Sequence, residues 1–305
     1  MGEPKHGGSK ICRNLRWNNS AIHAILVYGG TMSFFRRLGR APYNLLRFLS
    51  QPWWTVVVLL AANLGKDYNI GLLTKLGLVR KMWRNSHQPG SASVFFEHVF
   101  MVVRLLETPK ALAGNVAEFG CYKGLSTASL SLACALTGRR LIVFDSFEGL
   151  PEPDQFVHHL GTDAVVPYKR GQYAGTLEEV RSNVLRFGDP TVCEFVKGYF
   201  DDTLPTRNVS ERFVLIFEDA DLPQSVRSVL KGAWKKLQPG GYFFCHEARD
   251  REVVDLFFDQ AWWAENLQER APGFMGSGIG MMSGPEITWC CLGYTVRSEG
   301  KHAQS

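Results

Sequence analysis

Polar residues with chemical potential follow several apolar stretches of this sequence, and the first such run is Glu118-Phe-Gly120-Cys-Tyr-Lys-Gly124. Gly120 would let the backbone turn sharply and let a ligand approach without a side chain in the way. The spacing is not the Gly-x-Gly-x-x-Gly fingerprint of dinucleotide-binding proteins. Because Glu118 would repel a pyrophosphate, the run favours a cationic ligand, such as a sulfonium with an amino group. The alternative is a strand-end carboxylate held by nearby backbone N–H groups.

A second run, Asp145-Ser-Phe-Glu-Gly149, begins about 25 residues after Gly120. An acid at that distance from a glycine turn can accept hydrogen bonds from both hydroxyls of a ribose. The same residue type also suits a helix N-cap, so Asp145 alone has two interpretations. The two runs together, each at a strand end, indicate a ligand site more specifically than either does alone.

Two further runs, Glu218-Asp219-Ala-Asp221 and Cys245-His246-Glu247, follow apolar segments later in the chain. If those segments are neighbouring strands, Asp219, His246 and Glu247 meet at one edge of the sheet. Carboxylates and an imidazole could hold a divalent cation. They could equally supply a general base for a hydroxyl group. The alternative is that Asp221 caps a helix and that the histidine is only hydrogen-bonded.

The elements that must position these residues alternate between strands and helices. Such alternation predicts a mostly parallel sheet with helices on both faces, and ligands then lie beyond the carboxyl ends of the strands. A loop over 150–175, rich in Pro and Gly, is long enough to be functional or mobile. Strands are predicted at 115–119, 140–144, 193–196, 213–217, 242–245 and 290–296, and helices at 94–107, 125–136, 176–187, 221–237 and 251–263.

These runs resemble the macrocin/mycinamicin O-methyltransferase (TylF-like) family of class I S-adenosylmethionine-dependent methyltransferases. The resemblance covers roughly residues 90–265 and is most specific in two segments, Phe144-Asp-Ser-Phe-Glu-Gly-Leu-Pro151 and Asp202-Thr-Leu-Pro205. It implies an α/β fold with a Rossmann-like, mostly parallel sheet of seven strands. We place the methyltransferase domain at 91–299, and the helical extension that precedes it lies outside the resemblance.

The resemblance also implies roles for single residues. Glu118, Gly120 and Tyr122 should line the methionine end of S-adenosylmethionine, and Asp145, Ser146 and Phe147 should hold its ribose and adenine. Gly124 is a further predicted cofactor-binding residue. Asp219 matches the family's first metal-binding aspartate, and an Asp-Asp pair is expected where this chain has His246-Glu247. Both residues of that pair can still ligate, but histidine favours softer metals than magnesium. The predicted metal ligands are therefore Asp219, His246 and Glu247, and the predicted catalytic residues are Asp219 and His246.

The function that follows is S-adenosylmethionine-dependent O-methylation of a hydroxyl on a small molecule or sugar. One alternative is a non-catalytic interaction protein with the same fold, docked to a membrane or a partner by its basic N-terminal region. Another is an NAD(P)-dependent oxidoreductase, which the missing Gly-x-Gly-x-x-Gly fingerprint disfavours. The resemblance leaves the acceptor, the metal and the oligomeric state open.

The charge distribution separates the N-terminal region from the rest of the chain. The whole 305-residue chain has a formal net charge of +5. Residues 1–90 hold 13 Lys and Arg against two acids, a net of +11, whereas residues 91–305 have a net of −6. The acidic part argues against nucleic acid as a partner. We expect a disordered tail over 1–31 and a basic helical extension or cap over 32–90, which could contact an anionic membrane peripherally.

Seven cysteines occur without a Cys-x-x-Cys pair or a zinc-site spacing. Reduced thiols are typical of the cytoplasm, and the first residues lack the apolar core of a secretory signal. We therefore expect a cytoplasmic protein.

Overall fold

The computed structural model describes residues 51–160, 164–276 and 291–298. By its internal contacts the chain divides into two units, Met1–Gln51 and Pro52–Ser305, and nearly all of the described residues belong to the second. Its helices are α3 (Trp54–Leu60), α4 (Leu72–Ser86), α5 (Phe95–Glu107), α6 (Leu125–Thr137), α7 (Leu177–Phe187), α8 (Phe200–Thr203), α9 (Pro223–Ala233), α10 (Arg251–Leu256) and α11 (Gln260–Leu267), with short 3-10 turns at Lys66–Tyr68, Pro190–Val192, Leu204–Thr206 and Trp234–Lys236. Its strands are β1 (Asn115–Phe119), β2 (Leu141–Asp145), β3 (Val157–His158), β4 (Val165–Val166), β5 (Cys193–Lys197), β6 (Phe213–Glu218), β7 (Leu237–Cys245), β8 (Met275–Gly276) and β9 (Gly293–Val296).

Seven strands form one sheet in the order β5-β2-β1-β6-β7-β9-β8. The first five strands in this order run parallel; at one edge β9 runs antiparallel to β7, and β8 runs antiparallel to β9. The predicted mostly parallel, seven-stranded sheet is confirmed. The chain proceeds outward from β1 through β2 to β5 and then returns to the other side of β1 with β6. The order of the strands therefore reverses between β1 and β6, which is where an open α/β sheet binds its ligands.

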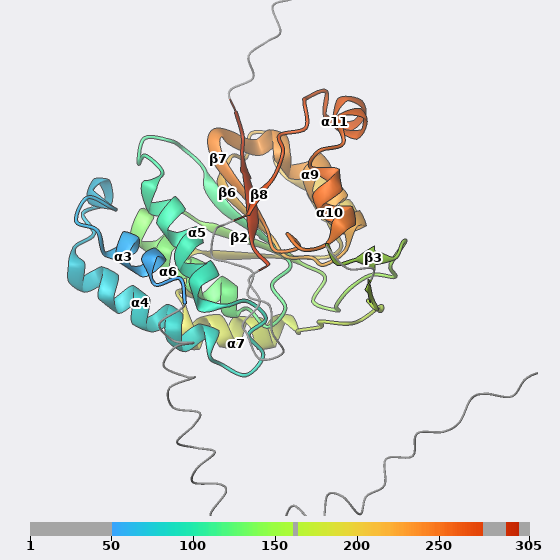
Figure 1. Cartoon of the computed structure of the whole chain (residues 1–305). Coiled ribbons are helices and arrows are strands. Elements are labelled where there is room, and N and C mark those ends of the chain that lie inside the picture. Colours follow the sequence, from blue (N-terminus) through green and yellow to red (C-terminus); the bar gives the residue numbers. More distant parts are fainter. Residues whose placement is uncertain (1–50, 161–163, 277–290, 299–305) are drawn as a thin grey trace, which may run out of the picture. The chain divides into compact units, whose positions relative to one another are not determined.

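Helices cover both faces of this sheet (Figure 1), with α3 to α6 on one side and α9 to α11 on the other. Because successive side chains of a strand point to opposite faces, neighbouring residues enter different cores. Val143 of β2 belongs to the core beneath α4, α5 and α6, whereas Ile142 and Phe144 belong to the core beneath α9 and α10. The strands β1, β2 and β6 are thus buried on both faces, which explains their nearly continuous apolar sequences.

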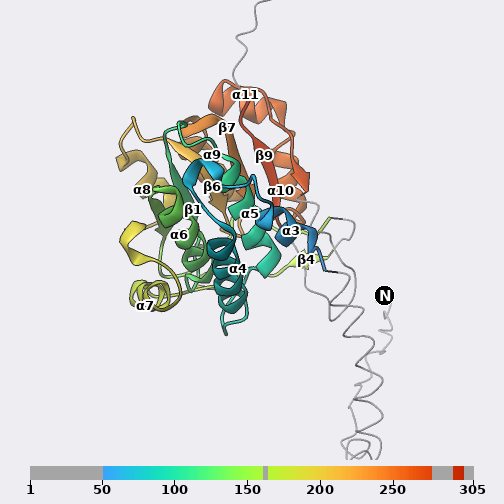
Figure 2. The same ribbon diagram turned by 90° about the vertical axis from the view of Figure 1, so that its left-hand side faces the viewer.

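The helices that precede β1 in the chain pack into the core that α4, α5 and α6 form with the sheet. Leu59 of α3 and Met82 of α4 are fully buried in the same apolar cluster as Val116 of β1. Figure 2 shows α3, α4 and α5 side by side next to α6. No helix in the described part of the chain is long and apolar enough to cross a membrane. The domain boundaries at 31 and 90 stay predictions, and residues 1–50 lie outside the described residues.

Several predicted boundaries differ from the structure. Strand β7 begins at Leu237, not at Tyr242, because Gln238–Gly241 continues the strand after an irregular register against β6. The segment 251–263 forms two helices, α10 and α11, and not one. Helix α9 has Leu222 at its N-cap position, so the capping role considered for Asp221 is wrong. The last strand is shorter than predicted, and Cys290 lies outside the described residues.

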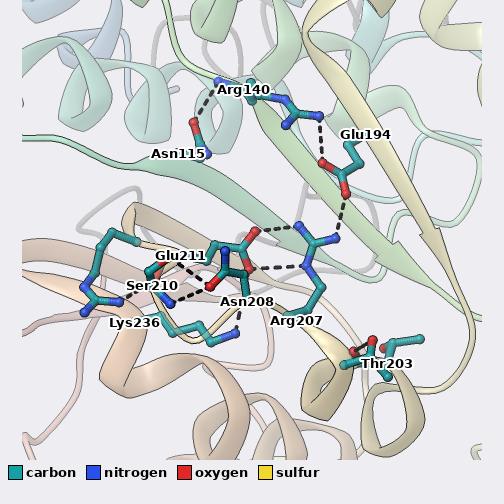
Figure 3. Close-up of polar contacts among 11 residues, drawn as sticks. Asn115, Arg140, Glu194, Thr203, Arg207, Asn208, Ser210, Glu211 and Lys236 are labelled. Atoms are coloured by element: carbon teal, nitrogen blue, oxygen red, sulfur yellow. Dashed lines mark hydrogen bonds and ion pairs between the residues drawn. The ribbon is translucent and has the colours of Figure 1, made fainter.

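A network of charged side chains joins the edge of the sheet to the loop before β6 (Figure 3). Glu194 of β5 accepts hydrogen bonds from Arg140 at 2.7 Å and from Arg207 at 2.6 Å. Arg207 also pairs with both carboxylate oxygens of Glu211, and Lys236 lies 3.8 Å from the same carboxylate. The guanidinium of Arg207 is mostly buried and bridges two acids, so it is the centre of this network.

We predict that Arg207→Met lowers the free energy of unfolding by about 1–3 kcal/mol, because two part-buried carboxylates lose their shared donor. Urea unfolding would measure the change. Arg227→Met is the matched control, since Arg227 pairs at 3.6 Å with the half-exposed Asp154 and has no other ion pair among the described residues. The control should change the unfolding free energy by less than about 0.5 kcal/mol. Equal effects of the two substitutions would show that the network does not stabilise the fold.

Candidate active site

A cavity of about 430 Å³ lies at the carboxyl edge of the sheet, where the strand order reverses. Residues after β1, β2, β5, β6 and β7 line it, together with the loop after β2 and the first half of α9. The predicted site residues in its lining are Gly120, Tyr122, Asp145, Ser146, Asp219, His246 and Glu247. The sheet thus brings together residues that are more than 120 positions apart in the sequence.

Gly120 makes the floor of this cavity possible. Its N–H donates to the carbonyl oxygen of Phe144 at 2.9 Å, and its φ of +82° lies in the left-handed region. A Cβ atom at this position would lie 2.0 Å from the carbonyl oxygen of Asp219. Only glycine therefore lets the turn after β1 approach the turn after β6 so closely.

Three residues without this freedom also adopt positive φ at the same edge. Tyr122, Phe147 and Asp221 have φ values of +48°, +56° and +62°, and they follow β1, β2 and β6 respectively. Non-glycine residues rarely adopt this conformation, and such strained positions cluster at functional sites. The three turns that surround the cavity are therefore held in uncommon conformations by the packing around them.

Asp145 connects the turns after β1 and β2. One carboxylate oxygen accepts the N–H of Cys121 at 2.7 Å, and the other accepts the N–H of Phe147 at 2.7 Å. Burial raises the pKa of Asp145 although these hydrogen bonds lower it. The residue lines the cavity and caps backbone amides at the same time, so the two interpretations of this acid are compatible.

Glu118, Gly124 and Phe147 do not line the cavity. Glu118 is fully buried and accepts a 2.6 Å hydrogen bond from Ser126, while its second oxygen has no hydrogen-bond partner among the described residues. Gly124 is the N-cap of α6, and the ring of Phe147 packs against Phe195. These three residues lie behind the lining, so their predicted contacts with the cofactor stay predictions.

Glu118 gives the protein a pH-dependent stability. Burial raises its pKa from an ordinary 4.5 to about 8. Between these values the folded protein keeps a proton that the unfolded chain has released, so stability falls as the pH rises from about 4.5 to 8. The slope from one such group reaches about 1.4 kcal/mol per pH unit.

We predict that Glu118→Gln flattens the pH dependence of the unfolding free energy between pH 4.5 and 8, because glutamine does not titrate. Urea unfolding at several pH values would measure it. Other raised carboxyls, such as Asp221, keep their own contribution in both proteins, so the difference between variant and wild type isolates Glu118. Parallel curves for the two proteins would contradict this account.

His246 and Asp219 form the central pair of the site. The Nδ1 atom of His246 lies 3.0 Å from Oδ1 of Asp219, and its Nε2 atom lies 3.3 Å from Oε2 of Glu97 in α5. Burial alone would lower the pKa of His246, but the charges and hydrogen bonds of these two carboxylates raise it well above the ordinary value. The ring is therefore held between two acids, of which one, Asp219, lines the cavity.

Further carboxyl groups surround this pair. Glu247 accepts the N–H of Asp221 at 3.0 Å. Burial, followed by the charge of Asp219, raises the pKa of Asp221 to about 8. Burial and the neighbouring Glu218 raise the pKa of Glu247 well above its usual range. The carboxyl groups at the rim of the cavity thus lie close together, and this crowding favours protonation of some of them or a nearby cation.

The spacing of the predicted metal ligands would suit a cation. Asp219, His246 and Glu247 each offer one ligand atom, and these atoms lie within 4.8 Å of one another. Both ring nitrogens of His246 are already engaged with carboxylates, however. As it is hydrogen-bonded in this structure, His246 does not fit the role of a metal ligand.

The loop over 150–175 forms part of the cavity wall, and two contacts join it to the start of α10. His158 pairs with Glu252 at 2.7 Å, and Tyr168 donates to Asp250 at 3.3 Å. The small sheet of β3 and β4 lies in this loop. Tyr168 and Tyr173 line the cavity. These contacts hold the described parts of the loop against the site; a functional or mobile role for the loop stays a prediction.

Sequence reasoning missed several residues of the site. Asp221 was visible in the same run as Asp219 but was assigned to a helix cap. Tyr168, Arg249 and Asp250 line the cavity from loops that carry no recognisable motif. Glu97 gave no signal either, because it occupies a predicted helix and only the fold brings it to His246.

Comparisons with known proteins agree with this geometry. A family model described as macrocin-O-methyltransferase (TylF) matches residues 102–268, more than half of the chain. An 8-demethyl-8-(2,3-dimethoxy-alpha-L-rhamnosyl)-tetracenomycin-C 4'-O-methyltransferase from Streptomyces olivaceus is 34% identical over 134 residues, which cover 42% of this chain. The match spans about half, 51%, of that relative's own length. A mycinamicin III 3''-O-methyltransferase from Micromonospora griseorubida is 29% identical over 174 residues, which cover 49% of this chain and 68% of the relative.

Among solved structures, the O-methyltransferase NovP has a similar fold. It matches with a TM-score of 0.51 and 18% sequence identity, over 72% of this chain and 88% of that chain. At this identity the likeness concerns the fold alone. It supports the arrangement of the sheet that positions the cavity.

Proposed function

Because this chain belongs to the macrocin-O-methyltransferase (TylF) family, we propose that it transfers the methyl group of S-adenosylmethionine to a hydroxyl oxygen of a small molecule or sugar. The observation that carries the proposal is the cavity at the strand reversal, which Gly120, Asp145 and Asp219 line from three neighbouring turns. Two relatives named above are O-methyltransferases, one acting on a rhamnosyl tetracenomycin and one on mycinamicin III. The class of acceptor in the proposal follows from those names.

We assign the cofactor to the part of the cavity next to β1 and β2. Gly120 and Tyr122 would contact its methionine end, while Asp145 and Ser146 would contact its ribose and adenine. Glu118, Gly124 and Phe147 would support these contacts from behind the cavity wall. When bound, S-adenosylmethionine supplies an electrophilic methyl group on a positively charged sulfur.

Asp219 is the proposed general base. It lines the cavity beyond Gly120, and its carboxylate is oriented by the His246 ring at 3.0 Å. As the acceptor oxygen forms its bond to the methyl carbon and the carbon–sulfur bond breaks, Asp219 takes the hydroxyl proton. The other product would be neutral S-adenosylhomocysteine, whose sulfur would keep the electron pair of the broken carbon–sulfur bond. The enzyme's main contribution is the alignment of oxygen, carbon and sulfur.

The alternative functions from the sequence have less support. An oxidoreductase would need a dinucleotide site, and the turn after β1 lacks the Gly-x-Gly-x-x-Gly fingerprint of such sites. A membrane contact of the basic N-terminal region stays a prediction, because residues 1–50 lie outside the described residues. The oligomeric state, the predicted cytoplasmic location and a role for a divalent metal also stay predictions.

Isothermal titration and a transfer assay test the proposal together. The full chain should bind S-adenosylhomocysteine with one site per chain and should not bind NAD⁺. It should then transfer a labelled methyl group to a member of a panel of glycosides and phenols, with mass spectrometry locating the new methyl ether. Binding of NAD⁺ without S-adenosylhomocysteine would refute the proposal. Binding of S-adenosylhomocysteine without transfer to any hydroxyl would favour the non-catalytic alternative.

A further inference from the structure

We propose that the bridge formed by Glu97, His246 and Asp219 takes the place of a divalent cation in this site, with Glu97 as the positioning residue that aims His246 at Asp219. The inference rests on the proposed function only for the role of Asp219 as the base. The inference itself concerns the group that holds the carboxylate of Asp219 in place. The resemblance implies a metal here, whereas the described contacts supply a hydrogen-bond donor from the chain itself.

The two contacts of His246 carry the first step of the argument. Its Nδ1 atom lies 3.0 Å from Asp219, and its Nε2 atom lies 3.3 Å from Glu97. An ionised carboxylate only accepts hydrogen bonds, so each ring nitrogen must donate. A nitrogen that carries a proton has no lone pair for a metal. The ring therefore cannot bind a cation without releasing one of its two carboxylates.

The fixation of Glu97 carries the second step. This side chain is fully buried in the first turn of α5. The oxygen that faces His246 also accepts the N–H of Val94 at 2.8 Å, and the other oxygen accepts the N–H of Cys291 at 3.0 Å. Three contacts from three different segments leave this carboxylate no room to rotate. A buried charge without a partner is costly, so Glu97 in turn requires the donor on His246.

The surrounding charge carries the third step. Asp219, Asp221 and Glu247 all line the cavity near the ring. The crowding of such acids is relieved when some of them hold a proton and when a positive partner contacts another. His246 lies at the place where that partner is needed and contacts Asp219 directly. A metal would be exchangeable, whereas this donor is part of the chain and has a fixed direction.

A metal-binding experiment tests the proposal without relying on turnover. Full-length protein would be titrated with Mn²⁺ in the presence of S-adenosylhomocysteine, and free Mn²⁺ would be followed by electron paramagnetic resonance. We expect wild type to show no saturable site up to about 1 mM Mn²⁺, which corresponds to less than about 4 kcal/mol of binding. The variant His246→Asp, which removes the donor and adds a carboxylate, should bind at least about tenfold more tightly.

Stoichiometric Mn²⁺ binding by wild type that is lost in Asp219→Asn would overturn the proposal. The wild-type titration decides the matter even if His246→Asp does not fold. Failure of the proposed function would look different, because the chain would then either not bind S-adenosylhomocysteine or bind it and transfer no methyl group, whatever its affinity for Mn²⁺. The two inferences can therefore fail separately.

The role of Glu97 is tested by nitrogen NMR of the histidine rings in the full chain. In wild type, both His246 nitrogens should carry a proton. Glu97→Gln should change the Nε2 signal of His246, and Glu97→Asp should largely restore it. The exposed His87 is an internal reference, because its Nδ1 atom contacts the carbonyl oxygen of Trp83 at 2.8 Å. A wild-type His246 with one unprotonated nitrogen, or a signal unchanged in Glu97→Gln, would refute the positioning role.

Discussion

Asp219→Asn is expected to lower kcat by about 10²–10⁴-fold while changing the affinity for S-adenosylhomocysteine by less than about threefold. The amide keeps the size of the side chain but cannot take the proton of the acceptor hydroxyl. It also loses its charge next to His246, 3.0 Å away. Single-turnover transfer of a labelled methyl group would measure the rate, and isothermal titration would measure the affinity.

The matched control for this variant is Asp255→Asn, which makes the same chemical change on an exposed position of α10. It should leave both quantities unchanged. If Asp219→Asn kept more than about a tenth of the wild-type rate, Asp219 would not be the base. Asp221, which also lines the cavity, would then be the next residue to test.

Asp145→Asn has the second large expected effect, a loss of about 10–100-fold in affinity for S-adenosylhomocysteine. The carboxylate accepts two backbone N–H groups at 2.7 Å each, from Cys121 and Phe147. An asparagine places an NH₂ group opposite one of these donors. The variant therefore disturbs the turns after β1 and β2 as well as the proposed contact with the ribose hydroxyls.

A stability measurement separates these two consequences. Asp145→Asn should unfold at a lower urea concentration than wild type, yet it should stay folded at the concentrations used for titration. Circular dichroism would confirm the fold before binding is measured. Unchanged affinity in a folded variant would mean that Asp145 only caps the backbone, the alternative interpretation of this residue.

The central sheet was the most predictable part of the molecule. The predicted strand 115–119 is β1 itself, and the strand at 213–217 differs from β6 by one residue. These strands are buried on both faces, so their apolar runs end where the polar site residues begin. The helix predicted over 176–187 is also confirmed as α7, which begins after Thr176, whose side chain accepts the N–H of Glu179.

The parts that were predicted wrongly depend on distant contacts. Strand β7 extends back to Leu237, which pairs with Phe213 of β6, and the Pro239-Gly240-Gly241 segment becomes an irregularity inside the strand, where Gly240 and Gly241 exchange backbone hydrogen bonds with Arg297. Asp221 does not cap α9, since a φ of +62° turns it toward the cavity instead. Neither feature can be recognised from the local sequence, because each depends on the surrounding fold.

The candidate site likewise contains residues whose proximity could be predicted from the sequence and residues whose proximity could not. Asp219 and His246 could be brought together in advance, because neighbouring parallel strands end at the same edge of the sheet. Glu97 could not, since it precedes His246 by 149 positions and its helix looks like any other apolar helix. The second contact of the His246 ring is therefore visible only in three dimensions.

A crystal structure of the full chain with S-adenosylhomocysteine tests the central claim most directly. We predict density for the ribose next to Asp145, for the amino acid part next to Gly120 and Tyr122, and for the sulfur on the side that faces Asp219. S-adenosylhomocysteine bound outside the cavity at the strand reversal, or bound there with its ribose away from Asp145, would contradict the account.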